Sequence, residues 1–427
     1  MKQRRGLRNL KWWIASVLFL ATLINYLDRQ TLAVATPDIV REFGLSNRDV
    51  AIINNAFTAA YTIGQLLTGR LIDLVGTKMG FVLIMVFWSV ADILCALSRG
   101  VFSLSVFRFL LGLGEAGNWP VSVKAVSEWF PARLRGLGVA WFSCGSGVGA
   151  MLAPIFIAQL ILWFGWRWAF VLTGLLGFLW LPLWLWFYHP PRKHWLITAE
   201  ELAEIEREVG RESRQPPMTL GQMFREWAAL LRYRQVWGVF MVRFFSDCIL
   251  WFYIQWLPKY FADERGYSME DIRNNLWIAF LPTIFATLLG GAASGRLIQR
   301  GWEVNRARKT VMLVTGLTMT ASIGVGLVES DLVALLLSSV ALLSFYGYSV
   351  NTLTLPADLV PPRLVASVSG LSGTGAGIGS ILFTFLVGYL ADQYSFRPVF
   401  VLVGIMPLLS LSMLFFVTGK IQRIIHE

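Results

Sequence analysis

Six charged residues lie inside otherwise apolar stretches of the sequence, where a charge is costly. They are Asp28, Arg29, Arg108, Glu115, Arg243 and Asp247. A charge at the centre of a bilayer costs about 2.5–3.5 kcal/mol on insertion scales. An arginine stays charged, and its planar fork binds a carboxylate through two hydrogen bonds. A buried carboxylic acid favours its neutral form and can load and release a proton near neutral pH. The set therefore predicts an anionic substrate with at least one carboxylate, and coupling to protons through Asp28 and Glu115.

An alternative, purely structural interpretation is that the six charges form three ion pairs, which fix how the helices pack. It suits Arg243 and Asp247 best, because residues four apart share a helix face. Arg108 and Glu115 are seven residues apart, too far along one helix for a direct bridge. Adjacent residues such as Asp28 and Arg29 point about 100° apart. The spacing therefore favours a functional role for the first four charges.

Uncharged polar residues in the same stretches could bind substrate hydroxyls. In the first half these are Asn25, Tyr61, Asn118, Ser143 and Ser146, and in the second half Tyr346, Asn351, Ser372 and Thr374. Each one alone is more typical of a hydrogen bond between packed helices. Asp92 is a further acid near the outer end of its apolar run, where snorkelling or capping would also explain it.

The composition excludes a soluble protein. Of 427 residues, 56% are hydrophobic and 15% are charged, with a mean hydropathy of +0.59. Soluble domains carry about 25% charged residues. The three cysteines and three histidines share no metal-ligand spacing, and no nucleophile–base set occurs, so neither a cofactor nor an enzymatic activity is expected. The net charge of +11 is concentrated in loops, which indicates membrane topology and not nucleic-acid binding.

Twelve apolar stretches are long enough to cross a bilayer, which needs about 20 residues each. They cover roughly 12–35, 50–75, 80–97, 101–123, 134–164, 168–188, 236–261, 272–298, 310–328, 332–355, 364–390 and 399–417. Of the 37 Lys and Arg residues, 26 fall on the side of the two termini and 8 on the other side. This asymmetry predicts that both termini are cytoplasmic. The alternative that the first stretch is a cleaved signal peptide conflicts with Asp28 and Arg29, which interrupt it.

The chain repeats itself. Residues 133–174 align with residues 363–404 at a constant offset of 230, and Gly145, Gly147 and Gly149 meet Gly375, Gly377 and Gly379. Six spans per repeat keep both copies in the same orientation, so two pseudo-symmetric six-helix bundles are expected. The predicted domains are 1–189 and 236–427, joined by a cytoplasmic linker at 190–235 whose run 198–212 is mainly a solvated connector. The glycine runs lack the Lys-Ser/Thr ending of a phosphate loop and predict close helix packing.

The segment Gly69-Arg-Leu-Ile-Asp73-Leu-Val-Gly76-Thr-Lys78 resembles the signature of the major facilitator superfamily, and Gly295-Arg-Leu-Ile with Arg308-Lys309 resembles its degenerate second copy. The resemblance implies a twelve-helix transporter that works by alternating access. It also implies that Asp73 caps a neighbouring helix and latches the outward-facing state, while Gly69 and Gly76 allow close approach.

More narrowly, the sequence resembles the anion:cation symporter family in two segments, Asn25-Tyr-Leu-Asp28-Arg29-Gln30 and Arg108-Phe-Leu-Leu-Gly-Leu-Gly-Glu115-Ala-Gly-Asn118-Trp-Pro120. Within that family, the sequence is most similar to the bacterial hexuronate branch. This implies proton sites at Asp28 and Glu115, anion-binding arginines at Arg29, Arg108 and Arg243, and a substrate-binding tyrosine at Tyr61. Galactonate transporters of the family carry a glutamine where this chain has Ser146, which weakens galactonate as the substrate.

The leading hypothesis is a proton-coupled symporter that imports a hexuronate-like sugar acid through a bacterial inner membrane. The alternatives are a symporter of another organic carboxylate, an organic phosphate antiporter, or a non-transporting nutrient sensor. Intramembrane acids argue against a phosphate antiporter because they would repel its substrate. The expected partners are the small anion, protons and lipid, with no nucleic acid and a monomeric assembly.

Overall fold

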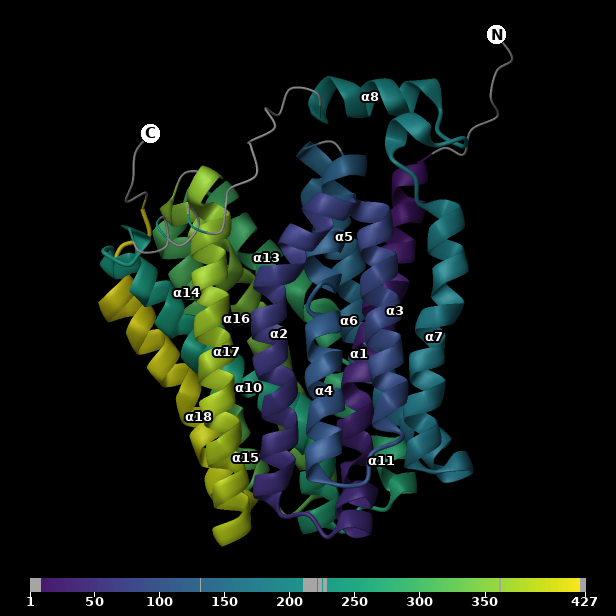
Figure 1. Cartoon of the computed structure of the whole chain (residues 1–427). Helices are drawn as coiled ribbons and strands as arrows, with labels where there is room; N and C mark the ends of the chain where they lie inside the picture. Colours follow the sequence, from purple (N-terminus) through teal and green to yellow (C-terminus); the bar gives the residue numbers. More distant parts are fainter. Residues whose placement is uncertain are drawn as a thin grey trace.

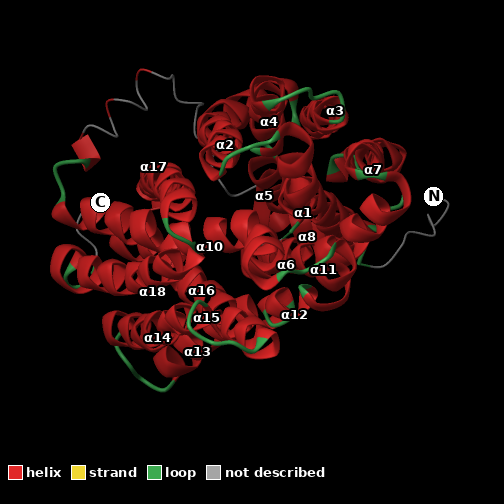
Figure 2. Cartoon of the chain, turned by 90° about the horizontal axis from the view of Figure 1, so that it is seen from below, coloured by secondary structure: helices red, strands yellow, loops and turns green. Residues whose placement is uncertain are grey.

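The computed structural model describes residues 9–130, 132–209, 221, 225, 229–360 and 362–422, and over these residues it is helical with short connections. Figures 1 and 2 show two groups of helices side by side, one from each half of the chain. The first group contains α1 (Leu10–Phe43), α2 (Asn47–Val75), α3 (Thr77–Cys95), α4 (Val101–Glu115), α5 (Asn118–Trp129), α6 (Ala132–Phe164) and α7 (Trp166–Phe187). The 3-10 turn η1 (Pro191–Lys193) and α8 (Ala199–Val209) follow it.

The second group begins with α10 (Arg234–Arg265). It continues with α11 (Met269–Asn275), α12 (Trp277–Phe280), α13 (Thr283–Gln299), α14 (Val304–Thr318), η2 (Met319–Ala321), α15 (Ser322–Val325), α16 (Asp331–Leu359), α17 (Pro362–Gln393), α18 (Phe396–Ser412) and the π-helical turn η3 (Met413–Thr418). The first described helix begins, and the last one ends, at the same end of the molecule, called here the terminal end (Figure 1).

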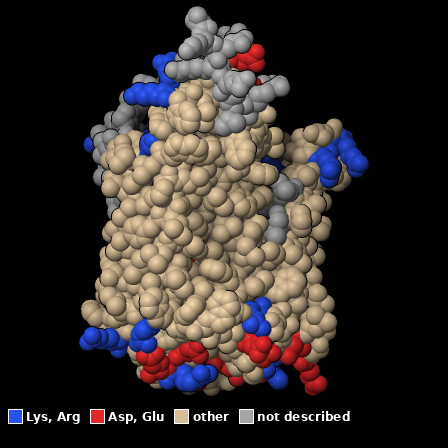
Figure 3. Space-filling model, turned by 90° about the vertical axis from the view of Figure 1, so that its right-hand side faces the viewer, with Lys and Arg blue, Asp and Glu red and all other residues tan. Residues whose placement is uncertain are grey.

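The described helices group into twelve segments that match the twelve predicted crossings. Among the described residues, eight helices are individually long and apolar enough to span a membrane. The other four crossings are the more polar α2, the pair α4–α5, the series α11–α13, and α14 with α15. Figure 3 shows a broad surface band without charged residues, with Lys, Arg, Asp and Glu gathered toward the two ends. That band is the expected lipid-facing surface of a multi-pass membrane protein.

The expected ends of the spans differ most at the first crossing, and the fourth crossing is not one continuous helix. Helix α1 continues to Phe43, beyond residue 35, because its last two turns pack at the closed end of the bundle. The fourth crossing is interrupted between Glu115 and Asn118. At this interruption Gly117 lies so close to Ile84 that a Cβ atom would be 2.4 Å from its side chain. The chain therefore changes direction where it packs tightly against α3.

The glycine runs do pack helices closely, as predicted. A Cβ atom on Gly145 or Gly149 of α6 would lie 2.4 or 2.8 Å from a backbone oxygen of α1. A Cβ atom on their repeat partners, Gly375 and Gly379 of α17, would lie 2.6 or 2.1 Å from a backbone oxygen of α10. We call these four residues the glycine seam. Small residues at such positions let helix backbones approach in a membrane.

The linker helix α8 is docked on the first half, which corrects the expectation of a mainly solvated connector. Ile205 is buried in the apolar core of the first half. Glu201 accepts hydrogen bonds from the backbone N–H groups of Leu10 (3.1 Å) and Lys11 (3.2 Å) at the start of α1. Free N–H groups at a helix start need such acceptors, and α1 has no side-chain cap of its own.

Candidate functional site

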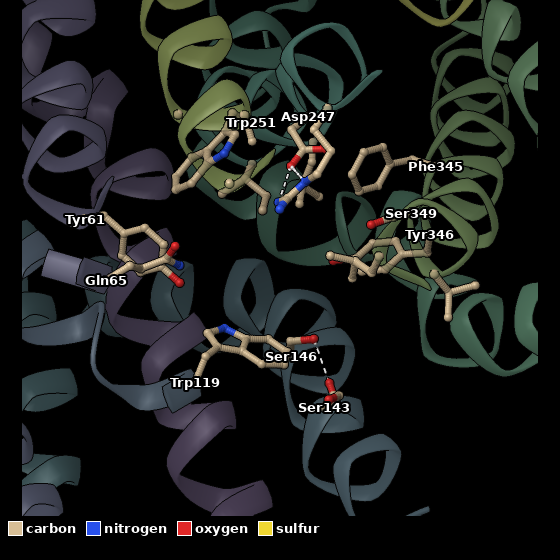
Figure 4. Close-up of a pocket in the computed structure, with 18 of the residues that line it drawn as sticks. Tyr61, Gln65, Trp119, Ser143, Ser146, Asp247, Trp251, Phe345, Tyr346 and Ser349 are labelled. Atoms are coloured by element: carbon tan, nitrogen blue, oxygen red, sulfur yellow. Dashed lines mark hydrogen bonds and ion pairs between the residues drawn. The ribbon is translucent and has the colours of Figure 1, made fainter. Parts of the chain in front are cut away.

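A cavity of about 520 Å³ lies between the two groups of helices. Its wall comes from α1, α2, α5 and α6 of the first half and from α10, α16 and α17 of the second. Figure 4 shows Tyr61, Trp119 and Ser146 facing Asp247 and Tyr346 across this space. Small-molecule sites typically measure about 300–1,000 Å³, so the cavity is large enough for a molecule the size of a monosaccharide.

Arg29 reaches the cavity wall while it is held from behind by Glu115. Both Nε (3.0 Å) and Nη2 (2.9 Å) of Arg29 contact Oε2 of Glu115, and Nη2 also donates to Oδ1 of Asn25 at 3.2 Å. The acid is fully buried and the arginine is 5% exposed. The bond joins α1 to α4 across 86 residues of sequence, and it is a charge-assisted hydrogen bond of the strong kind.

Aromatic rings surround the guanidinium of Arg29. Its Cζ lies 4.9 Å from the ring centre of Tyr26, 4.7 Å from Tyr61 and 5.5 Å from Phe57 and from Trp251. Rings at these distances attract a cation and limit its movement. Because Trp251 belongs to α10, the second half helps to position the arginine of the first.

The second half contributes Arg243 and Asp247 to the cavity wall. Their ion pair measures 2.7 Å from Nη2 to Oδ2, and Nη1 of Arg243 lies 3.5 Å from the Ser372 hydroxyl. Both side chains are more exposed than the Arg29–Glu115 pair, at 19% and 13%. The local salt bridge on one helix, which the structural interpretation expects, is therefore present. Arg243 also lines the cavity.

The structure brings only part of the predicted site together around the cavity. Arg29, Tyr61, Ser143, Ser146, Arg243 and Tyr346 line it. Asn25, Asp28, Glu115 and Asn118 are fully buried outside the lining set. Asn25 supports Arg29 within α1, and Asn118 of α5 donates to Thr22 of α1 at 3.3 Å, so the Asn118 contact joins two helices in this state.

Arg108 is placed behind the cavity wall. It is 1% exposed, its Cζ lies 4.4 Å from the ring centre of Phe57, and it is absent from the lining residues. In the second half, Asn351 accepts from Arg308 and lies away from the cavity, while Thr374 lines a neighbouring one. Asp92 is fully buried and accepts a hydrogen bond from Thr173 at 2.9 Å, which is incompatible with snorkelling.

Sequence reasoning missed several lining residues, among them Gln65, Trp119 and Trp251. A signal for each one was available. Gln65 lies one helical turn after Tyr61, Trp251 lies one turn after Asp247, and Trp119 follows Asn118. Residues four apart share a helix face, so a search along the faces of the predicted residues would have found two of the three.

The cavity continues toward the terminal end and is closed at the opposite end. A second cavity of about 440 Å³ shares Gln65, Trp119 and Gly373 with the first and extends along α5 to Val123. At the opposite end, Asn55 of α2 donates to the Ile381 carbonyl of α17 at 3.1 Å, and Arg273 of α11 donates to Gln159 of α6 at 2.8 Å. The two halves are therefore joined at the end opposite the terminal end, while the cavities extend toward the terminal end.

The signature segment is described only in part. Gly69 and Asp73 lie in α2, but their side-chain surroundings fall outside the described part of the structure, so the capping role expected of Asp73 stays a prediction. Gly76 has a φ of +85° between α2 and α3, a conformation that glycine adopts without strain. Lys78 donates to the Leu185 carbonyl of α7 at 2.7 Å and contacts His189 at 3.0 Å.

Known proteins resemble the chain along its whole length. Its residues 18–371 and 277–423 match the model of the Major Facilitator Superfamily. The Hexuronate transporter of Escherichia coli (strain K12) is 33% identical over 408 residues, which is 95% of this chain and 93% of that protein. The D-galactonate transporter of Escherichia coli O6:H1 is 29% identical over 420 residues, with 96% and 95% covered.

A solved structure shares the fold. It is a bacterial homolog of the human lysosomal transporter Spinster in an inward-facing and occupied conformation, with a TM-score of 0.74 and 18% identity over 97% of this chain and 98% of that one. The twelve crossings, the internal repeat and the family match agree. The chain belongs to the Major Facilitator Superfamily, and it is a multi-pass membrane transporter and not an enzyme.

Proposed function

We propose that this protein is a proton-coupled symporter that imports a hexuronate-like sugar acid by alternating access. The observation that carries the proposal is Arg29, which lines the cavity while its guanidinium is paired with the buried Glu115. A substrate carboxylate and Glu115 compete for the same guanidinium. Protonation of Glu115 removes its charge and frees Arg29 for the substrate, so that the proton and the anion travel together.

The cycle that follows from this competition has four steps. Facing outward, Glu115 takes a proton and Arg29 binds the substrate carboxylate through its fork. The two halves then rock about the central site, as in other major facilitator transporters. Facing inward, the anion and the proton leave. Glu115 then pairs again with Arg29, which is the arrangement present in this structure.

Recognition of the sugar is assigned to the polar and aromatic wall. Arg243 supplies the positive charge on the opposite side, and Tyr61, Ser146 and Tyr346 offer hydroxyls. Similarity to the E. coli Hexuronate transporter supports a hexuronate over a galactonate. Arg108, Asn25 and Asn118 lie behind the wall, and we assign them to holding Arg29 and the helices around it.

We place the moving domains at 1–189 and 236–427, with both termini and the linker 190–235 on the cytoplasmic side of a bacterial inner membrane, and we take the working unit to be a monomer. In this orientation the cavity leads to the cytoplasm and the structure is inward-facing. Because α8 is docked on the first half, we expect this part of the linker to move with the first domain.

Transport by the purified protein in liposomes tests the proposal. Labelled glucuronate, galacturonate, galactonate and a sugar phosphate are offered under an imposed inward proton gradient, with and without an uncoupler. We expect accumulation of a hexuronate that the uncoupler abolishes, and no accumulation in empty liposomes. Exchange of the sugar phosphate that ignores the uncoupler would support an antiporter instead, and uptake of none of the acids would contradict the proposal.

A further inference from the structure

In and behind the cavity wall, the buried charges of this cluster in the first half do not balance. The acids Asp28, Asp92 and Glu115 and the arginines Arg29 and Arg108 are each at most 5% exposed. If all five were ionised, this cluster would hold one uncompensated negative charge. An unpaired charge in a low-dielectric interior costs several kcal/mol. One of the three acids is therefore expected to hold a proton in this conformation.

Glu115 is not that acid, because Arg29 holds it as an ion pair at 2.9 Å. The excess charge therefore belongs to Asp28 and Asp92, because Arg108 is the one other cation among these five residues. Neither oxygen of Asp28 and only one oxygen of Asp92 has a hydrogen-bond partner among the described residues. Nε and Nη1 of Arg108 also have no hydrogen-bond partner among the described residues.

A chain of contacts brings the two aspartates to one junction of α1, α3 and α7. Thr31, one turn after Asp28 on α1, lies 3.4 Å from the hydroxyl of Thr173 on α7. That hydroxyl lies 2.9 Å from Asp92 on α3. The charges acting on Asp92 come from Arg108 and Glu115 on α4 and from Asp28 on α1, with Cys95 on its own helix.

The Thr173 hydroxyl can contact either form of Asp92, because it donates to a carboxylate, as described above, and accepts from a protonated carboxyl group. Its oxygen lies 2.9 Å from Asp92 Oδ2, 2.9 Å from the Ala169 carbonyl and 3.3 Å from the Phe170 carbonyl. A hydroxyl has one proton to donate and two lone pairs to accept with. When it donates to the carbonyl of its own helix, as buried threonines commonly do, only a protonated Asp92 can complete the contact.

We propose that Asp92 is a proton-carrying residue of the transport cycle, and that Asp92 and Asp28 form a buried pair that together holds one proton where α1, α3 and α7 meet. The inference rests on the proposed proton-coupled function and adds Asp92 to the proton sites expected at Asp28 and Glu115. The pair lies outside the cavity wall, so it can exchange its proton without displacement of the anion.

Infrared spectra of the purified protein in lipid test the pair directly, without substrate. We expect the wild type to show a protonated-carboxyl band at neutral pH. The variants Asp92→Asn and Asp28→Asn each leave two acids against two arginines, so each should lose this band. Asp38→Asn is the matched control, because Asp38 lies on α1 and pairs with the exposed Arg41. It should keep the band.

Absence of the band in the wild type, or its persistence in both variants, would overturn the proposal. Loss in only one variant would assign the proton to that residue alone and would overturn the shared pair. If Asp92→Asn does not give folded protein, Asp92→Glu keeps the acid and displaces its carboxyl group by one methylene. That variant should shift the band, and an unshifted band would count against Asp92. Failure of sugar-acid uptake would contradict the proposed function but would leave this spectroscopic result unchanged.

Discussion

Asp392, at the end of α17, caps the first turn of α2 through the backbone of Asn47. The N–H groups of Asn47 and Arg48 donate to its two carboxylate oxygens at 2.8 and 2.9 Å. An acid at a helix N-terminus also interacts favourably with the helix dipole. This contact joins the two halves at their closed end, so it stabilises the conformation that is open toward the terminal end.

Replacement of Asp392 by asparagine should weaken this connection. The dipole interaction at an exposed helix end contributes about 0.3–1 kcal/mol, so the ratio of the two conformations should shift about 2- to 5-fold toward the outward-facing state. Spin labels at the exposed positions Phe102 and Leu327 would report the separation at this end by pulsed electron resonance. An unchanged distance distribution would show that Asp392 does not act as a latch.

Glu115→Gln should abolish uphill, gradient-driven accumulation of the sugar acid while counterflow exchange survives. The amide cannot take up a proton and no longer neutralises Arg29, so the anion can still bind and cross without energy from the gradient. Glu42→Gln is the control, because Glu42 lies at the far end of α1 and pairs with Arg167. Accumulation at the wild-type level would exclude Glu115 as the coupling residue.

Arg29→Lys should weaken substrate binding by at least about tenfold, which corresponds to about 1.4 kcal/mol. A lysine keeps the charge but loses the planar fork that grips a carboxylate, and it is too compact to fill the space among Tyr26, Tyr61 and Trp251. Affinity is measured by calorimetry on the purified protein. Arg41→Lys, on the exposed end of the same helix, should leave affinity unchanged. Equal affinities for both variants would refute direct contact between Arg29 and the substrate.

Glu201→Ala should destabilise the start of α1 without touching the cavity. Loss of a helix N-terminal cap costs about 0.5–2 kcal/mol, and here the acceptor for Leu10 and Lys11 comes from α8. Thermal unfolding in detergent should show a lower midpoint than for Glu200→Ala, whose side chain is exposed. Equal midpoints would mean that the cap contributes nothing measurable.

The bilayer explains why so much of the fold could be predicted from the sequence. Every crossing must be an apolar helix, so twelve runs and an internal repeat determine the architecture. The depth of a particular side chain within a bundle is not determined in this way. Arg108 and Arg29 look equivalent in sequence, but Arg29 lines the cavity, whereas Arg108 lies outside the lining residues with its guanidinium against Phe57.

Contacts between residues that are far apart in the sequence could not be predicted from it either. Arg29 and Glu115 are 86 residues apart, and the sequence around one of them does not indicate that the other is its partner. Arg243 and Asp247 are one turn apart on one helix, and their bridge could be foreseen. The docking of α8 was missed for the same reason, since Glu201 caps residues about 190 positions earlier in the chain.

The glycine seam has a mechanical consequence for both halves. Because Gly145 and Gly149 press α6 onto α1, and Gly375 and Gly379 press α17 onto α10 in the same register, neither helix of a pair has room to slide past its neighbour. Each half is therefore expected to move as a rigid body, in which the paired long helices rotate together. Each half places one arginine at the cavity, Arg29 in the first and Arg243 in the second. A rotation that keeps the glycine seam packed moves each arginine together with its half. Such a rotation changes only the side of the membrane to which the two arginines are accessible.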